Sequence, residues 1–133
     1  MQEQENEKNV SLLIRDGAGV SNFLRIKSSI PISKHDRGEV KISLSRDYYR
    51  MPVFLKVGAL AELIVRAVME TVPSVQMISF RPKQVILNLG VWNIWTEEKE
   101  RTVKELIDSL LTKRGLITQW SVQRGVGETP KPL

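Results

Sequence analysis

The sequence predicts an α+β fold in which two helices pack on one face of an antiparallel sheet. The predicted order is a ferredoxin-like βαββαβ arrangement over residues 39–124, extended by N-terminal strands. Two patterns support this class, namely short segments in which apolar and polar residues alternate and two longer segments with helical apolar spacing. A chain of 133 residues, 41% of them hydrophobic, forms one domain with a packed core. We place that domain at residues 10–124, between a disordered tail at 1–9 and a flexible tail at 125–133.

Three strands are predicted in the first part of the chain, at residues 10–15, 20–27 and 40–45. A glycine-rich turn at 16–19 and a charged, proline-containing loop at 31–38 separate them. In the second strand Leu24 and Ile26 fall on one side. The opposite side carries Phe23, Arg25 and Lys27. This strand therefore presents one basic, aromatic face.

The middle of the chain predicts a helix at 57–72 followed by a β-hairpin. The helix lies between Pro52, which disfavours helix in the residue before it, and Pro73. Apolar residues occupy more than one of its sides, and its polar stripe contains only Glu62, Arg66 and Glu70. We expect such a helix to be buried on more than one side, in the core of its own domain or against a second copy. Apolar runs at 75–81 and 84–91, joined by Pro82-Lys83, predict the hairpin.

A second helix and a last strand complete the predicted domain. Thr96 suits an N-cap, Glu97 and Glu98 suit the first turn, and Gly115 suits the residue after the helix. The predicted buried stripe consists of Val103, Leu106, Ile107, Leu110 and Leu111. The strand at 116–124 places Trp120 in the core, and we expect Trp92 and Trp95 at corners of the core.

The composition argues against catalysis, cofactors and metals. The sequence has no cysteine and one histidine, His35, which stands in a charged loop with Ser33 two residues away. No G-x-S-x-G, GK[ST] or dinucleotide-binding pattern is present. We therefore predict a protein that is not an enzyme, with no catalytic residue, no cofactor and no metal site. No apolar run is long enough to span a bilayer and residues 1–9 do not resemble a signal peptide, so we expect a cytoplasmic protein with no membrane partner.

The net charge of +5 arises within residues 21–60, which hold eight basic and three acidic side chains. A basic face of this kind attracts polyanions by counterion release. The segment Arg46-Asp47-Tyr48-Tyr49-Arg50 adds two aromatic rings between guanidinium groups, a combination typical of single-stranded nucleic-acid binding. The predicted site consists of Phe23, Arg25, Lys27, Lys41, Arg46, Tyr48, Tyr49 and Arg50. We predict a nucleic-acid-binding protein that prefers RNA or single-stranded DNA.

Two other functions stay open at this stage. One is a homo-oligomeric protein-interaction or assembly module that associates through helix 57–72, with incidental positive charge. The other is a small-molecule regulatory domain. The order of elements resembles that of the RNA recognition motif, in which strand aromatics stack on bases. The stretch QVILNLGVW at 84–92 lacks the basic-Gly-aromatic-Gly pattern of that family, so we do not assign the chain to it.

Overall fold

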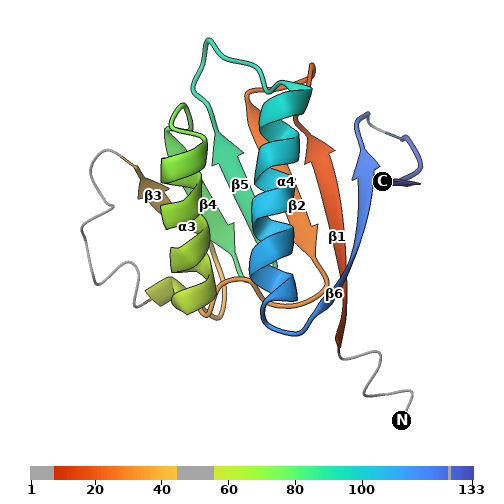
Figure 1. The fold of residues 1–133 in the computed structure, drawn as a ribbon. Coiled ribbons are helices and arrows are strands. Elements are labelled where there is room, and N and C mark those ends of the chain that lie inside the picture. The colour runs from red at the N-terminus through yellow and green to blue at the C-terminus, as the bar shows by residue number, and fades with distance from the viewer. Residues whose placement is uncertain (1–7, 45–55, 126) are drawn as a thin grey trace.

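The computed structural model describes residues 8–44, 56–125 and 127–133, and in them the chain forms an α+β fold (Figure 1). The strands are β1 (Asn9–Asp16), β2 (Phe23–Ser28), β3 (Val40–Ser43), β4 (Met77–Arg81), β5 (Gln84–Asn88), β6 (Ile117–Gln123) and β7 (Lys131–Pro132). The helices are α3 (Ala59–Thr71) and α4 (Glu97–Thr112). The predicted fold class is therefore confirmed, and no helix in these three ranges is long and apolar enough to cross a membrane.

The described strands form one sheet of seven, in the order β3-β4-β5-β2-β1-β6-β7. The predicted hairpin is present, because β4 and β5 pair antiparallel across Pro82-Lys83. The exact ferredoxin-like order is not confirmed. Strands β1 and β2 lie inside the sheet, between β5 and β6, instead of extending it, and β3 pairs antiparallel with β4. The sheet is mixed and not wholly antiparallel, because β1 runs parallel to β6.

Both helices pack on the same face of the sheet, as Figure 1 shows for α3 in front of β4 and for α4 farther along the sheet. The alternation of apolar and polar residues explains this arrangement, because every second side chain of a strand points to the same face. On β1 the buried members are Val10, Leu12 and Ile14, and on β2 they include Leu24 and Ile26. The core therefore lies between the sheet and the helices, and the opposite face of the sheet remains open toward the solvent in the part of the chain that the structure describes.

Helix α3 is buried within its own domain. Ala61, Ile64, Val65 and Val68 are fully buried in the core of the same chain. Among the larger apolar residues of this helix only Leu63 is exposed, at 43%. Glu62 and Arg66 form an i, i+4 ion pair of 2.7 Å on the polar stripe. The apolar breadth that the sequence shows in this helix is thus explained mainly by the core of its own domain.

Helix α4 begins and ends as predicted. The Thr96 side chain accepts a hydrogen bond of 3.2 Å from the Lys99 N–H, and Gly115 has a positive φ of 82°. The Thr96 hydrogen bond satisfies a backbone N–H at the start of the helix. The positive φ of Gly115 allows the chain to turn away at its end. Val103, Ile107 and Leu111 are buried, whereas Leu106 and Leu110 are only partly buried.

Candidate nucleic-acid interface

Five basic side chains lie on the open face of the sheet. Along each strand they alternate with the residues that face the core. They are Arg15, Arg25, Lys27, Lys41 and Arg81. The registers of the strands arrange them in two rows. Lys41, Ser79, Ile86, Arg25 and Arg15 form the first row. Arg81, Gln84 and Lys27 form the second.

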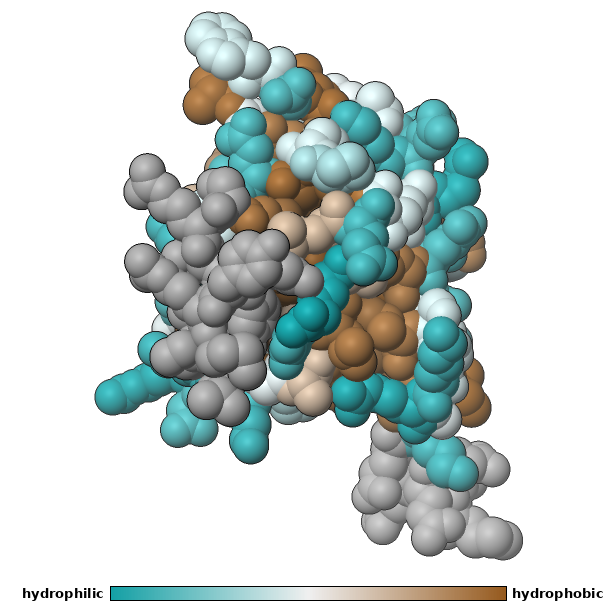
Figure 2. Space-filling view, turned by 60° about the vertical axis from the view of Figure 1, so that its left-hand side comes forward, coloured by the Kyte–Doolittle hydropathy of each residue, from teal (hydrophilic) through white to brown (hydrophobic). Residues whose placement is uncertain are grey.

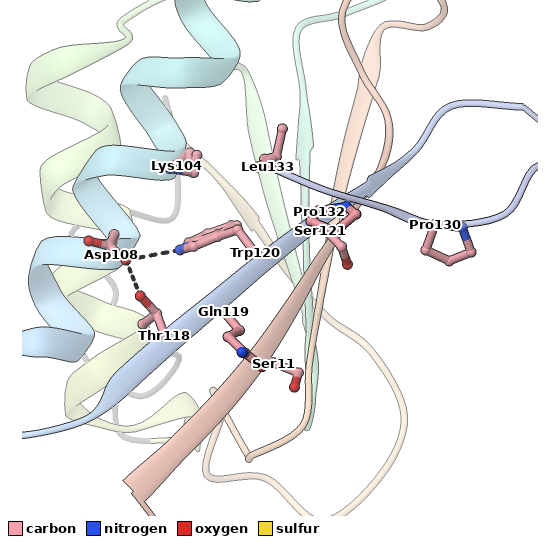
Figure 3. Close-up of a pocket in the computed structure, with 10 residues that line it drawn as sticks. All are labelled: Ser11, Lys104, Asp108, Thr118, Gln119, Trp120, Ser121, Pro130, Pro132 and Leu133. Carbon is pink, nitrogen blue, oxygen red and sulfur yellow. Dashed lines mark hydrogen bonds between the residues drawn. The ribbon is translucent and has the colours of Figure 1, made fainter.

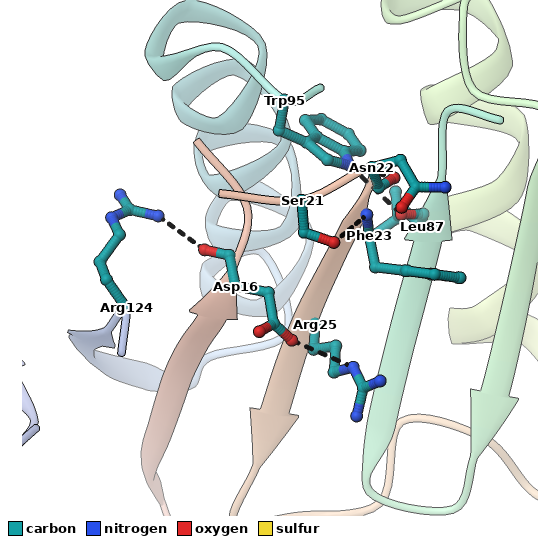
Figure 4. A network of polar contacts seen from close by, with 8 residues as sticks. All are labelled: Asp16, Ser21, Asn22, Phe23, Arg25, Leu87, Trp95 and Arg124. Atoms are coloured by element: carbon teal, nitrogen blue, oxygen red, sulfur yellow. Dashed lines mark hydrogen bonds and ion pairs between the residues drawn. The ribbon is translucent and has the colours of Figure 1, made fainter. Parts of the chain in front are cut away.

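Two of these five cations have an acidic partner. Arg25 Nε lies 3.1 Å from Asp16 Oδ2 (Figure 4), and Arg81 Nη2 lies 3.7 Å from Glu39 Oε2. No ion pair joins Arg15, Lys27 or Lys41 to another residue of the described ranges. Exposed ion pairs such as these two contribute little energy and break easily. The open face therefore carries an excess of positive charge.

A hollow of about 270 Å³ lies on this face between β2 and β3. Its apolar lining consists of Phe23, Met77 and Ile86, which are all partly buried. Its charged lining consists of the exposed cations Arg25 and Lys41 and of Glu39, the acidic partner of Arg81. An apolar surface flanked by two cations offers contact area for a flat ring and charge for an attached anion.

The structure thus brings four of the predicted site residues onto one face. Phe23, Arg25 and Lys27 share the outward side of β2, as the alternation predicts, and Lys41 shares that face from β3. The strands β4 and β5 lie between β2 and β3, so these residues do not form one continuous cluster. Phe23, Arg25 and Lys41 line the hollow, whereas Lys27 lies outside it. The remaining four predicted residues, Arg46, Tyr48, Tyr49 and Arg50, lie outside the residues that the structure describes.

A buried tryptophan fixes the end of the sheet at which Phe23 lies. Trp95 is 1% exposed, and its indole N–H donates to the carbonyl oxygens of Asn22 at 3.1 Å and Leu87 at 3.3 Å (Figure 4). Its backbone N–H also donates to the Ser21 carbonyl at 3.0 Å. Trp95 is therefore a core residue, and it ties β2, β5 and the start of α4 together. This anchoring holds the backbone beside Phe23 in place. The prediction of a corner of the core, which Trp95 meets, is wrong for Trp92, which is 93% exposed and lies outside the core.

A buried ion pair next to this region was not foreseen from the sequence. Glu100 is 7% exposed and accepts two hydrogen bonds from Arg124, of 2.6 and 2.5 Å. These bonds raise the pKa of Arg124 and outweigh the opposite effect of burial. Arg124 also donates to the carbonyl oxygen of Asp16 at 2.9 Å (Figure 4), and so links α4 to the end of β1. The sequence contains an indication of this burial, because Glu100 precedes Val103 by three positions and so lies on the buried stripe of α4.

A larger cavity, of about 650 Å³, lies elsewhere among the described residues, beside β6 and β7 (Figure 3). Trp120 lines it and is only partly buried, so its prediction as a core residue is not met. Its indole N–H donates to Asp108 at 2.9 Å, and the Thr118 hydroxyl donates to the same carboxylate. Burial raises the pKa of Asp108, but these hydrogen bonds and the nearby Lys104 outweigh that effect, so the pKa lies below its usual value. These contacts join α4 to β6.

The histidine loop forms a local structural motif. Ser33 is 2% exposed, and its hydroxyl is hydrogen-bonded to Nδ1 of His35. The other ring nitrogen of His35 lies 3.0 Å from the carbonyl oxygen of Gly38. Both partners are within three residues of His35, so the imidazole stabilises the turn of its own loop. No group of three or more potential metal ligands occurs within residues 8–44, 56–125 and 127–133.

Among the described residues, the open face, with its unpaired cations and its apolar hollow, is the candidate binding surface. A polyanion with flat rings matches both features. Searches of protein-family models, curated protein sequences and solved structures find no match to this chain.

Proposed function

We propose that the chain is a non-enzymatic nucleic-acid-binding protein that prefers RNA or single-stranded DNA. The observation that carries this proposal is the hollow on the open face, where the cations Arg25 and Lys41 flank the apolar side chains of Phe23, Met77 and Ile86. Backbone phosphates would approach the cations, and a base would lie against the apolar surface.

The preference for unpaired bases follows from the shape of this surface. The face of a base is accessible for stacking only when the base is not enclosed in a double helix. The hollow of about 270 Å³ falls below the usual range of small-molecule pockets, about 300–1,000 Å³. A single flat base on a longer strand suits it better than an enclosed small molecule does. This comparison argues against a small molecule as the ligand of this hollow.

The segment Arg46–Arg50 belongs to this proposal because of its place in the sequence. It follows β3, the strand that carries Lys41, with only two residues between Ser43 and Arg46. Its two arginines would add phosphate contacts, and Tyr48 and Tyr49 would add stacking surfaces.

A titration of labelled oligonucleotides tests the proposal. Fluorescence anisotropy is measured with a single-stranded oligonucleotide and with its duplex, at about 50 and about 200 mM salt, where counterion release has a large effect. We expect tighter binding of the single strand and weaker binding of both forms at the higher salt concentration.

A pair of charge-matched variants locates the binding surface. Lys41→Gln removes one positive charge from the open face, whereas Lys99→Gln removes one from α4 on the opposite side of the sheet. We expect only Lys41→Gln to weaken binding. No binding of the wild-type protein at low salt would refute the function, and equal losses in both variants would move the surface away from the open face.

A further inference from the structure

A cluster of exposed apolar side chains projects from the end of the sheet that carries Phe23. We call it the apolar tip, and it consists of Val20, Val91, Trp92 and Ile94, which are 52%, 82%, 93% and 57% exposed. The last three belong to the connection between β5 and α4, and hydrophobic side chains reach the surface at this upper end of the molecule (Figure 2). Val20 lies beside them, because Gly19 N–H donates to the Trp95 carbonyl at 2.9 Å. Exposed apolar clusters of this kind mark surfaces that contact a partner.

The backbone that carries the tip is held in place by hydrogen bonds. The Gly90 N–H donates to Asn88 Oδ1 at 2.7 Å, and the Asn93 amide donates to the Leu89 carbonyl at 3.2 Å. Trp95, with its two indole hydrogen bonds, closes the connection at its other end. The exposed Trp92 is therefore presented on an ordered backbone, which lowers the entropy cost of burying it against a partner.

The hollow on the open face has the complementary properties. It offers the partly buried side chains of Phe23, Met77 and Ile86 to an apolar group, and its two cations, Arg25 and Lys41, outnumber its one acid, Glu39. The tip contains no charged residue between 89 and 96 and is followed directly by the exposed acids Glu97 and Glu98. Apolar surface would thus meet apolar surface, with acids of one side opposite cations of the other.

We propose that the apolar tip of one copy of this chain binds the hollow on the open face of a second copy. Asn88 lines the hollow and also holds the start of the tip, so the two surfaces lie at the same end of the sheet. Two copies related by a twofold axis can then exchange tips, and the association closes as a dimer. The contact is centred on the Trp92 side chains of the two copies and is smaller than a standard interface. Its affinity is therefore low, and the dimer is in concentration-dependent equilibrium with the monomer.

This association also regulates the hollow, and that consequence rests on the proposed nucleic-acid function. A tip seated in the hollow covers Phe23 and the two cations beside it. Nucleic acid and the second copy therefore compete for the same surface, and a single-stranded oligonucleotide converts the dimer to monomers.

Analytical ultracentrifugation of the full chain over a wide range of concentrations tests the proposal. We expect the wild-type protein to pass from monomer to dimer, and Trp92→Ser to raise the dissociation constant about 30-fold or more, as for a central interface tryptophan. Ile117→Ser is the matched control, because Ile117 is 59% exposed on β6 at a distance from the tip in the sheet order. Thermal unfolding of each variant confirms that it is folded.

A charge exchange tests the other half of the contact. Lys41→Glu is expected to weaken the dimer, and Glu98→Lys in the same chain is expected to restore part of the association. Monomer at every concentration, or a dimer that Leu63→Ser disrupts and Trp92→Ser does not, would overturn the proposal. The ultracentrifugation result decides this point even if the protein binds no nucleic acid.

The oligonucleotide provides the last distinction. Dissociation of the dimer by a single-stranded oligonucleotide, with Trp92→Ser binding that oligonucleotide at least as tightly as the wild type, supports competition. The opposite result is weaker oligonucleotide binding by Trp92→Ser, together with quenching of the wild-type tryptophan emission that the variant does not show. That result would assign the tip to the nucleic-acid site and refute its role in self-association.

Discussion

The three unpaired cations of the open face allow a prediction for the salt dependence of nucleic-acid binding. Each phosphate contact on a single strand contributes about −0.7 to the slope of log K against log salt. If Arg15, Lys27 and Lys41 each contact one phosphate, the slope is about −2.1, and affinity falls about 18-fold between about 50 and about 200 mM salt. Lys27→Gln leaves two such contacts, so the slope becomes about −1.4 and the fall about 7-fold.

Anisotropy titrations at four or five salt concentrations measure this slope for the wild-type protein, Lys27→Gln and the control Lys99→Gln. If Arg25 and Arg81 also leave their acidic partners and bind phosphates, the wild-type slope steepens to about −3.5. The change caused by Lys27→Gln remains about 0.7 in either case. If Lys27→Gln is folded and binds the oligonucleotide with an unchanged slope, the proposal that the phosphates contact the open face is refuted.

Further predictions address stacking, the tyrosine segment, the buried ion pair and acid stability. Phe23→Ala is expected to cost about 1–3 kcal/mol of oligonucleotide affinity with little change in salt slope, because stacking releases no counterions; a changed slope in the same titration would contradict this role. Arg46→Ala or Arg50→Ala should reduce the slope, whereas Tyr48→Ala or Tyr49→Ala should lower affinity alone, and unchanged binding in all four would remove this segment from the site. Glu100→Gln should lower the free energy of unfolding in urea by about 1.5–3 kcal/mol, because the neutral amide can accept from Arg124 with one oxygen only and leaves the Arg124 charge unpaired, and no loss would show that Arg124 finds other partners. The pKa of Asp108 is lowered in the folded protein, so its contribution to stability is complete above the unfolded pKa and is lost as pH falls through the folded pKa. Asp108→Asn should therefore lose less stability than the wild type over that acidic range in pH-dependent melting. Equal losses would contradict a lowered pKa of Asp108.

The local elements of the fold could be predicted from the sequence because each has its own signal within a few residues. The alternation around Phe23, Arg25 and Lys27 determines which side chains share a face, and this pattern is independent of the neighbouring strand. The order of strands has no such local signal. Placing β2 between β5 and β1 depends on pairings such as Arg25 with Ile86, between residues far apart in the chain. The same limit explains why the hollow between β2 and β3 was not foreseen.

Side chains with two possible roles were the other source of error. Glu100 stands among several acids near the start of α4, which hides the fact that its position on the buried stripe requires a partner for its charge. Trp120 was assigned to the core on its size and strand position, but β6 is followed in the sheet only by the short β7, so its side chain is covered less completely than that of Trp95. Burial at the edge of a sheet depends on the strand order, which the periodicity of one strand does not contain.

The parallel pairing of β1 with β6 has a consequence for how the chain folds. Asn9 and Ile117, which are partners in this pair, are more than a hundred positions apart in the sequence. Closing so long a loop is slow, and the pairing cannot form during synthesis until almost all of the described chain has left the ribosome. Until then β1 has an unpaired edge beside its apolar residues Val10, Leu12 and Ile14, a condition that favours aggregation of nascent or truncated chains.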